Sequence, residues 1–199
     1  MFSVIVLAAG GSSRMGSNKL LASIWGRPLV VWSVESALSS GSGEVIVVLG
    51  LEAERVREVL PPGVRVVMNR EWMEGVSSSI RRGVEAVDSD SEAAVIMVAD
   101  QPLTPPAIPA ILASLILHGR HPLASAAVGG MPRNPAAFHR RLFGELLALR
   151  GDKGARSVID SHLSDSALLE VPEDMLLDVD TAEDLAGLSR RPPPRRGAG

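Results

Sequence analysis

The chain alternates short aliphatic runs with stretches in which apolar residues recur at helical spacing. The aliphatic runs predict strands at 2–8, 44–49, 64–68 and 93–98, and the stretches between them predict helices at 28–40, 52–60 and 76–87. This regular succession is typical of a doubly wound, mostly parallel sheet with right-handed crossovers. We therefore expect a Rossmann-like α/β fold of three layers, with helices on both faces of the sheet.

The pattern becomes looser after Asp100. It predicts a helix at 105–118, strands at 123–127 and 135–138, helices at 139–149 and 153–162, strands at 168–171 and 176–179, and a last helix at 181–188. No linker interrupts this succession, so we expect a single domain over 1–189. Arginine and proline dominate 190–199, and we expect this tail to be disordered.

Composition and charge exclude several classes of protein. Phe and Trp contribute three residues each and Tyr none, which leaves no aromatic platform for stacking single-stranded bases. Four of the 20 basic residues lie in the last ten positions, so the preceding body has 16 basic and 23 acidic residues. A body this acidic does not attract a nucleic-acid backbone, and we expect no nucleic-acid partner.

The absence of cysteine excludes disulfides, thiolate nucleophiles and cysteine-ligated metals. The apolar run at 2–9 is too short to span a membrane and follows no basic residue, so it predicts neither an anchor nor a signal peptide. We expect a cytoplasmic protein without membrane contact.

The first strand leads into a glycine-rich loop, LAAGGSSRMGSNK. Lys19 stands two positions too late for the phosphate-binding loop of kinases and ATPases, and the adjacent Gly10 and Gly11 do not fit the dinucleotide fingerprint. Consecutive glycines still allow backbone N–H groups to face an anion, and Arg14 and Lys19 add two cations. The alternative is an ordinary turn with two solvated cations.

Asp100 directly follows the apolar run VIMVA, where a carboxylate needs a compensating partner. The carboxyl ends of parallel strands form the ligand crevice of an open α/β sheet, so Asp100 should meet the glycine-rich loop and the MNREW segment there. Oxygen ligands beside a phosphate site favour Mg²⁺. Capping of the following helix is the alternative role for Asp100.

A second acidic segment, LLDVDTAEDL, precedes the last predicted helix. Asp178 and Asp180 alternate, so in a strand they point to the same side, while Thr181 and Asp184 suit a helix start. Two acids on one side of the strand indicate a further magnesium ligand.

Taken together, LAAGGSSRMGSNKLL, NREWMEGVSSSIRRG, VADQP, RGDKGAR and DVDTAEDL resemble the MobA-like NTP transferases, and most of all the molybdenum cofactor cytidylyltransferases. The resemblance extends over about residues 3–188. It implies a nucleotidyltransferase in which an acceptor phosphate attacks the α-phosphorus of an NTP, with Mg²⁺ as cofactor and pyrophosphate as the leaving group.

The resemblance also implies a role for each matching residue. Arg14 and Lys19 would hold the triphosphate, and Asp100 would bind the metal with Asp180, or as second choice Asp178. The nucleotide would be lined by Leu7, Ala8, Ala9, Gly10, Gly11, Ser12, Ser78 and Ser79. Ala9 matches the form that uses CTP, where the guanosine form has glycine. Trp72, beside this loop, is a further candidate contact.

The acceptor is less well matched. Asn134 stands where the cytidylyltransferases usually have histidine, so the pterin-type phosphate acceptor is the weaker part of the resemblance. RGDKGAR is predicted to be a turn in which Asp152 caps a helix, with Arg156 on the acceptor as the alternative. The resemblance implies a molybdoenzyme or chaperone as protein partner. Rival functions are a guanylyltransferase, an isoprenoid or sugar-phosphate nucleotidyltransferase, and a non-catalytic nucleotide-binding chaperone or sensor.

Overall fold

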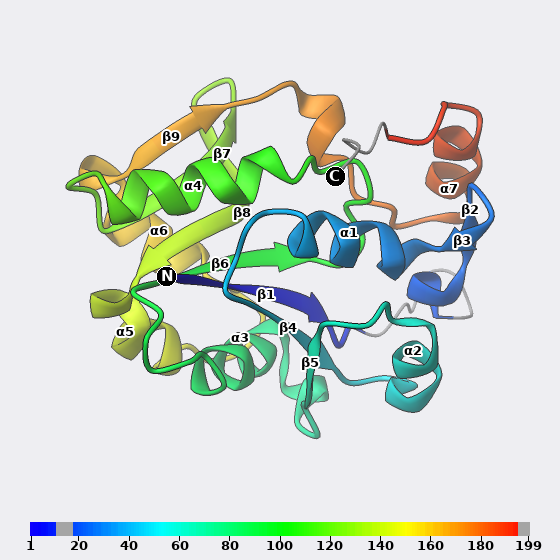
Figure 1. Cartoon of the computed structure of the whole chain (residues 1–199), viewed down its shortest axis with the longest axis horizontal. Helices are drawn as coiled ribbons and strands as arrows, with labels where there is room; N and C mark the ends of the chain where they lie inside the picture. The colour runs from blue at the N-terminus through cyan, green and yellow to red at the C-terminus, as the bar shows by residue number, and fades with distance from the viewer. Residues whose placement is uncertain (11–17, 195–199) are drawn as a thin grey trace.

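The fold is centred on a seven-stranded sheet, seen in the computed structural model that describes residues 1–10 and 18–194 (Figure 1). The strand order is β5-β4-β1-β6-β8-β7-β9, and only β8 runs antiparallel to its neighbours. The strands are β1 (Phe2–Ala8), β4 (Glu44–Leu49), β5 (Arg65–Met68), β6 (Ala93–Val98), β7 (Leu123–Val128), β8 (Met131–His139) and β9 (Ala167–Glu170).

Helices cover both faces of the sheet, as expected for aliphatic strands buried on both sides. Alternate residues of β1 show this, because Val4 and Val6 belong to one core cluster and Ile5 to another. The first face carries α1 (Leu29–Leu38), α2 (Ala53–Val59) and α4 (Ala107–Leu117), and the second carries α3 (Val76–Glu85), α5 (Phe143–Leu147) and α6 (Arg156–Ser161). The predicted three-layer α/β class is thereby confirmed.

The prediction of a strand at 176–179 is wrong. The structure has a short 3-10 helix, η5 (Glu173–Leu176), followed by an extended segment that joins no sheet. Val179 fixes this segment, because its N–H donates to the carbonyl of Asp100 at 3.0 Å and its side chain is buried. The segment is thus held by this backbone bond, by a side-chain bond from Gln101 to Asp178 and by one buried side chain, in place of a strand ladder.

A small third core attaches the C-terminal part of the chain. Strands β2 (Ser23–Ile24) and β3 (Arg27–Pro28) pair beside α7 (Ala182–Ser189), and Val179 packs there with Leu188. Trp25 stands edge-on to Trp32 at 5.0 Å, and its indole N–H donates to the carbonyl of Arg191 at 2.7 Å. The first residues of the expected tail are thus tied to the fold, whereas 195–199 lie outside the described residues.

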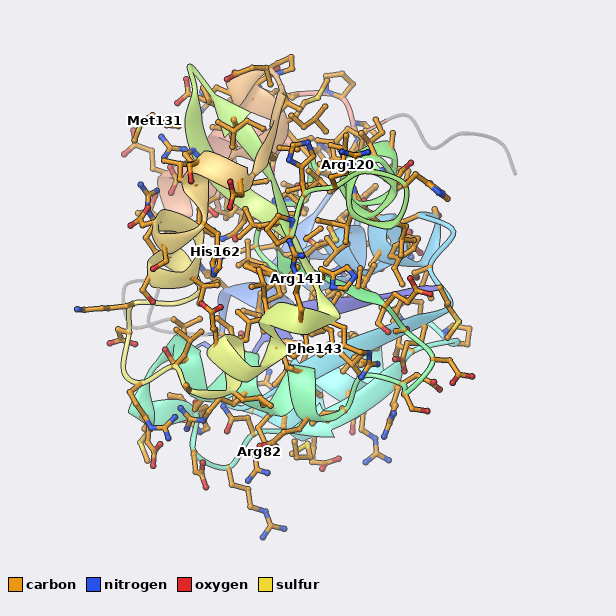
Figure 2. All side chains as sticks on the ribbon, turned by 90° about the vertical axis from the view of Figure 1, so that its left-hand side faces the viewer. Arg82, Arg120, Met131, Arg141, Phe143 and His162 are labelled. Atoms are coloured by element: carbon orange, nitrogen blue, oxygen red, sulfur yellow. The ribbon has the colours of Figure 1, made fainter. Side chains whose placement is uncertain are left out.

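The amino ends of the parallel strands lie together at one end of the molecule, away from this third core. Figure 2 views this end, where Arg141 lies in the connection between β8 and α5 and Phe143 begins α5. His162 of the same end lies 2.9 Å from the carboxylate of Glu145. Over the described ranges, no three His, Asp or Glu side chains form a metal-binding group, and no helix is long and apolar enough to cross a membrane.

Candidate functional site

A cavity of about 1060 Å³ opens at the other end of the sheet, beyond the carboxyl ends of β6, β1, β4 and β5. Ligands of open α/β sheets bind in this position. Its lining combines the end of β1, the segments that follow β4 and β5, and the residue after β6; among the lining residues are Leu7, Ala8, Ala9, Gly10, Lys19, Trp72, Ser79, Asp100 and Asp152.

One wall of the cavity is a cluster of charges. The ammonium of Lys19 lies 2.7 Å from a carboxylate oxygen of Asp100 and 2.7 Å from one of Asp180. Burial disfavours the charged ammonium, but attraction to both carboxylates outweighs this cost and raises the pKa of Lys19 above its ordinary value. Lys19 is therefore a permanent cation that joins the two ends of the chain.

Asp178 lies beside this cluster, although it lines a second, smaller cavity next to α7 and not the main one. Burial and the neighbouring charge of Asp100 raise the pKa of Asp178 to about 6, although its oxygen accepts a hydrogen bond from the amide of Gln101 at 3.1 Å. Of the described carboxylates, Lys19 pairs with Asp100 and Asp180 and not with Asp178, so burial and the charges of these two carboxylates disfavour ionisation of Asp178.

The backbone holds Asp180 in place through the start of α7. Thr181 caps this helix by accepting from the N–H of Asp184 at 3.1 Å. The carboxylate of Asp184 returns bonds to the N–H groups of Thr181 at 2.8 Å and Asp180 at 3.1 Å. Because these bonds favour the ionised form, the pKa of Asp184 is lowered. Thr181 and Asp184 thus form the helix start that the sequence predicts.

The charged wall fits a divalent cation. Oδ1 of Asp100 and Oε1 of Gln101 are buried acceptors with no hydrogen-bond partner among the described residues. Unpaired buried oxygens are rare, since each costs on the order of 1–3 kcal/mol. Asp100 does not cap α4, which begins at Ala107. Two carboxylates leave most positions of a magnesium ion to phosphates and water, as this metal prefers.

Close packing brings the end of β1 against Trp72. A Cβ on Gly50 would lie 2.7 Å from the carbonyl oxygen of Ala9 and 2.8 Å from the side chain of Trp72, so only glycine fits there. Trp72 begins the short helix η2 (Trp72–Glu74). Gly50 therefore allows an indole ring to stand beside the predicted nucleotide-binding residues.

The two predicted serines are fixed by a buried asparagine that the sequence analysis missed. The amide of Asn69 donates to Ser78 Oγ at 2.8 Å and to Ser79 Oγ at 3.0 Å. Ser79 lines the cavity, whereas Ser78 donates to the carbonyl of Gly75 at 2.8 Å and supports the turn. The two hydroxyls thus have different roles.

The start of α3 is closed by a loop from the other half of the chain. Asp152 Oδ1 accepts from the N–H of Val76 at 3.2 Å, and the carbonyl of Gly151 accepts from the N–H of Ser77 at 3.1 Å. Gly75 has a φ of 105°, and a Cβ there would lie 2.4 Å from Asp152 Oδ1. Asp152 does cap a helix, but this helix is α3 and not the adjacent α6.

The cavity contains most of the predicted nucleotide-binding residues that the structure describes. Leu7, Ala8, Ala9 and Gly10 line it together with Lys19, Ser79 and Asp100. Gly11, Ser12 and Arg14 lie outside the described residues. Asn134, on β8, is not part of the cavity lining. The functional assignments of all these residues remain predictions.

Comparison with known proteins identifies the family. The model of the MobA-like NTP transferase domain matches residues 4–186. The purine catabolism protein PucB of Bacillus subtilis is 30% identical over 191 residues, which cover 90% of this chain and 92% of that protein. The nicotine blue oxidoreductase of Paenarthrobacter nicotinovorans is 32% identical over 166 residues, covering 82% and 76%.

A further relative is much longer. The bifunctional protein GlmU of Trichlorobacter lovleyi is 30% identical over 103 residues, so the match covers 50% of this chain and only 22% of GlmU.

Solved structures agree with the family match. The manganese complex of Rv0371c from Mycobacterium tuberculosis has a TM-score of 0.79 at 27% identity, covering 94% of this chain and 97% of that one. A nucleotidyl transferase from Methanothermobacter (Mth528) has a TM-score of 0.82 at 28% identity, covering 95% and 96%. The chain belongs to the MobA-like NTP transferases, a family of nucleotidyltransferases that bind nucleoside triphosphates and phosphorylated acceptors.

Proposed function

We propose that this protein is a magnesium-dependent cytidylyltransferase that transfers CMP from CTP to the phosphate of a molybdopterin-type acceptor and releases pyrophosphate. The observation that carries the proposal is the charged wall of a cavity of about 1060 Å³, where Lys19 and Asp100 line the cavity and the ammonium of Lys19 pairs with both Asp100 and Asp180. Such a wall suits a polyphosphate that arrives with a divalent cation.

Asp100 and Asp180 would hold the magnesium ion, with the unpaired Oδ1 of Asp100 as one ligand. When bound, the ion would neutralise charge on the phosphates. The manganese complex of Rv0371c, a structural relative at 27% identity, supports a divalent cation in this fold. Mg²⁺ is preferred here because the ligands are hard carboxylate oxygens.

Lys19 would bind the triphosphate. Lys19 lines the cavity, and its ammonium pairs with two carboxylates at the cavity wall. From this position it would reach the phosphate oxygens of a nucleotide bound in the cavity. In the reaction, an acceptor phosphate oxygen would bond to the α-phosphorus while the bond from that phosphorus to the bridging oxygen of the β-phosphate breaks. Lys19, with Arg14 by the family match, would stabilise the charge that develops on the oxygens.

The base is assigned to cytosine because of Ala9, whose methyl group stands in the cavity where the guanosine-using form has glycine. GTP is the alternative, and a sugar-phosphate or isoprenoid acceptor is the alternative to the pterin. A methyl group changes binding by only about 1–3 kcal/mol, so the base must be tested directly.

Thermal shift with each NTP and Mg²⁺ tests the nucleotide. CTP should raise the melting temperature most, since a ligand stabilises the folded state by mass action. An equal or larger shift with GTP would refute the base assignment. Incubation with CTP and a molybdopterin-type phosphate should then release pyrophosphate.

Asp100→Asn tests the metal. The variant should lose Mg²⁺-dependent pyrophosphate release by about 100-fold or more, because one ligand charge is gone. Asp90→Asn changes an exposed carboxylate that precedes the amino end of β6, at the end of the sheet away from the cavity, and should leave turnover unchanged. Full turnover by Asp100→Asn would refute the assignment.

A further inference from the structure

Asp152 stands on the cavity wall away from the charge cluster. Asp100 follows β6, whereas Gly75 and Val76, which touch Asp152, lie at the start of α3, a helix that packs against β1, β4 and β5. The cavity extends over the ends of all four strands, and three intervals of about 4.8 Å make this a width of roughly 14 Å, comparable to the length of a nucleoside triphosphate. If phosphates occupy the Lys19 end, the base reaches the wall where Asp152 lies.

The orientation of Asp152 is set by the helix start. Its Oδ1 accepts from the N–H of Val76 and occupies the space that a side chain at position 75 would need, since a Cβ there would lie 2.4 Å from Oδ1. The carbonyl of Gly151 accepts from the next N–H, that of Ser77. The N–H groups of Val76 and Ser77 are therefore already used in hydrogen bonds. The group left to interact with a ligand here is the carboxylate of Asp152, which is an acceptor.

Ser79 supplies the complementary group on the same wall. Its oxygen accepts from the amide of Asn69 at 3.0 Å, which directs the hydroxyl hydrogen away from Asn69. Ser79 and Asp152 both line the cavity. One donor and one anionic acceptor match the pyrimidine edge of cytosine, which has acceptors at O2 and N3 and an amino group at position 4. Uracil has a carbonyl there, which the carboxylate would repel.

We propose that Asp152 is a specificity-determining residue that accepts a hydrogen bond from the exocyclic amino group of the base and rejects uracil. This inference rests on the proposed nucleotide site and adds a residue from the second half of the chain to base selection.

Asp152→Asn provides the test. Asparagine keeps the oxygen that accepts from Val76, so α3 stays capped, but its NH₂ group can now donate to the O4 of uracil. Calorimetric titration with CTP, UTP and GTP in Mg²⁺ compares the variant with the natural protein. We expect CTP binding to weaken about tenfold or more and the CTP/UTP ratio to fall at least as far. Asp160→Asn, which removes an exposed carboxylate on α6, is the matched control and should keep both affinities.

Each outcome has a distinct meaning. An unchanged CTP/UTP ratio in a folded Asp152→Asn protein, while the natural protein prefers CTP, overturns the role of Asp152 and leaves the proposed function standing. A natural protein that binds CTP and UTP equally well also overturns it. If Asp152→Asn weakens the binding of GTP and leaves the binding of CTP unchanged, the choice of cytosine is overturned. Absence of all nucleotide binding in the natural protein overturns the proposed function itself.

Discussion

Replacing Lys19 by methionine tests the charge cluster on which the site depends. The ammonium makes two charge-assisted contacts of 2.7 Å, and its side chain is only 16% exposed. Such contacts contribute roughly 1.5–3 kcal/mol each, but Asp180 is 48% exposed and its share is reduced by solvent. We therefore expect Lys19→Met to lower the free energy of unfolding by about 3 kcal/mol, or the melting temperature by roughly 6–12 °C for a domain of this size.

The same variant should respond more strongly to metal. Without the ammonium, Asp100, Asp178 and Asp180 repel one another, and a divalent cation relieves this repulsion. Melting curves with and without millimolar Mg²⁺, in the absence of nucleotide, should show a larger stabilisation of Lys19→Met than of the natural protein.

The other lysine of the chain supplies the control. Lys153 is exposed, and Lys153→Met should melt like the natural protein and show the same response to Mg²⁺. If Lys19→Met melts at the natural temperature and gains nothing extra from Mg²⁺, the carboxylates are not held by Lys19 and the electrostatic reasoning is refuted.

Two further predictions concern Gly75, which lines the cavity, and Asp178, which lies beside the charge cluster. Gly75→Ala should lower the free energy of unfolding in urea by about 1–3 kcal/mol, because φ is 105° and the new Cβ meets Asp152 and Gly151; Gly144→Ala, with open space around it, should cost nothing comparable. The raised pKa of Asp178 means that the folded state disfavours its ionised form, so this group lowers stability as pH rises from about 4 to about 6. In metal-free melts, Asp178→Asn should therefore gain stability relative to the natural protein over that interval, and a constant difference would contradict the assignment.

The parts of the fold that could be predicted from sequence are those that local pattern determines. The runs at 2–8, 44–49 and 93–98 coincide with β1, β4 and β6, because strands buried on both faces must be aliphatic throughout. The ends of the first and fourth predicted strands also placed Gly10 and Asp100 beyond the carboxyl ends of the sheet, where both line the cavity. Local alternation around Asp178 was misleading, because the buried Val179 between two acids gives the pattern of a strand without a neighbouring strand to pair with.

The groups that sequence reasoning missed depend on contacts between distant residues. Asn69 looks like an ordinary loop residue, yet it holds Ser78 and Ser79 with one buried amide. The bond from Val76 to Asp152 joins positions 76 residues apart, and no local signal reports it. The available clue for Asn69 was its position directly after a predicted strand. A side-chain amide buried there needs hydrogen-bond partners, and the nearby serines could supply them.

The pairing of Lys19 with Asp180 bridges 161 residues and has a consequence for synthesis of the protein. While the chain is still on the ribosome, the glycine-rich loop and Asp100 are exposed long before the segment that carries Asp180. An unfinished chain therefore has Lys19 and Asp100 but not the second carboxylate that pairs with Lys19. If the proposed site is right, metal and nucleotide would bind tightly only to molecules whose last helix has been made and docked, and would stabilise only the finished protein.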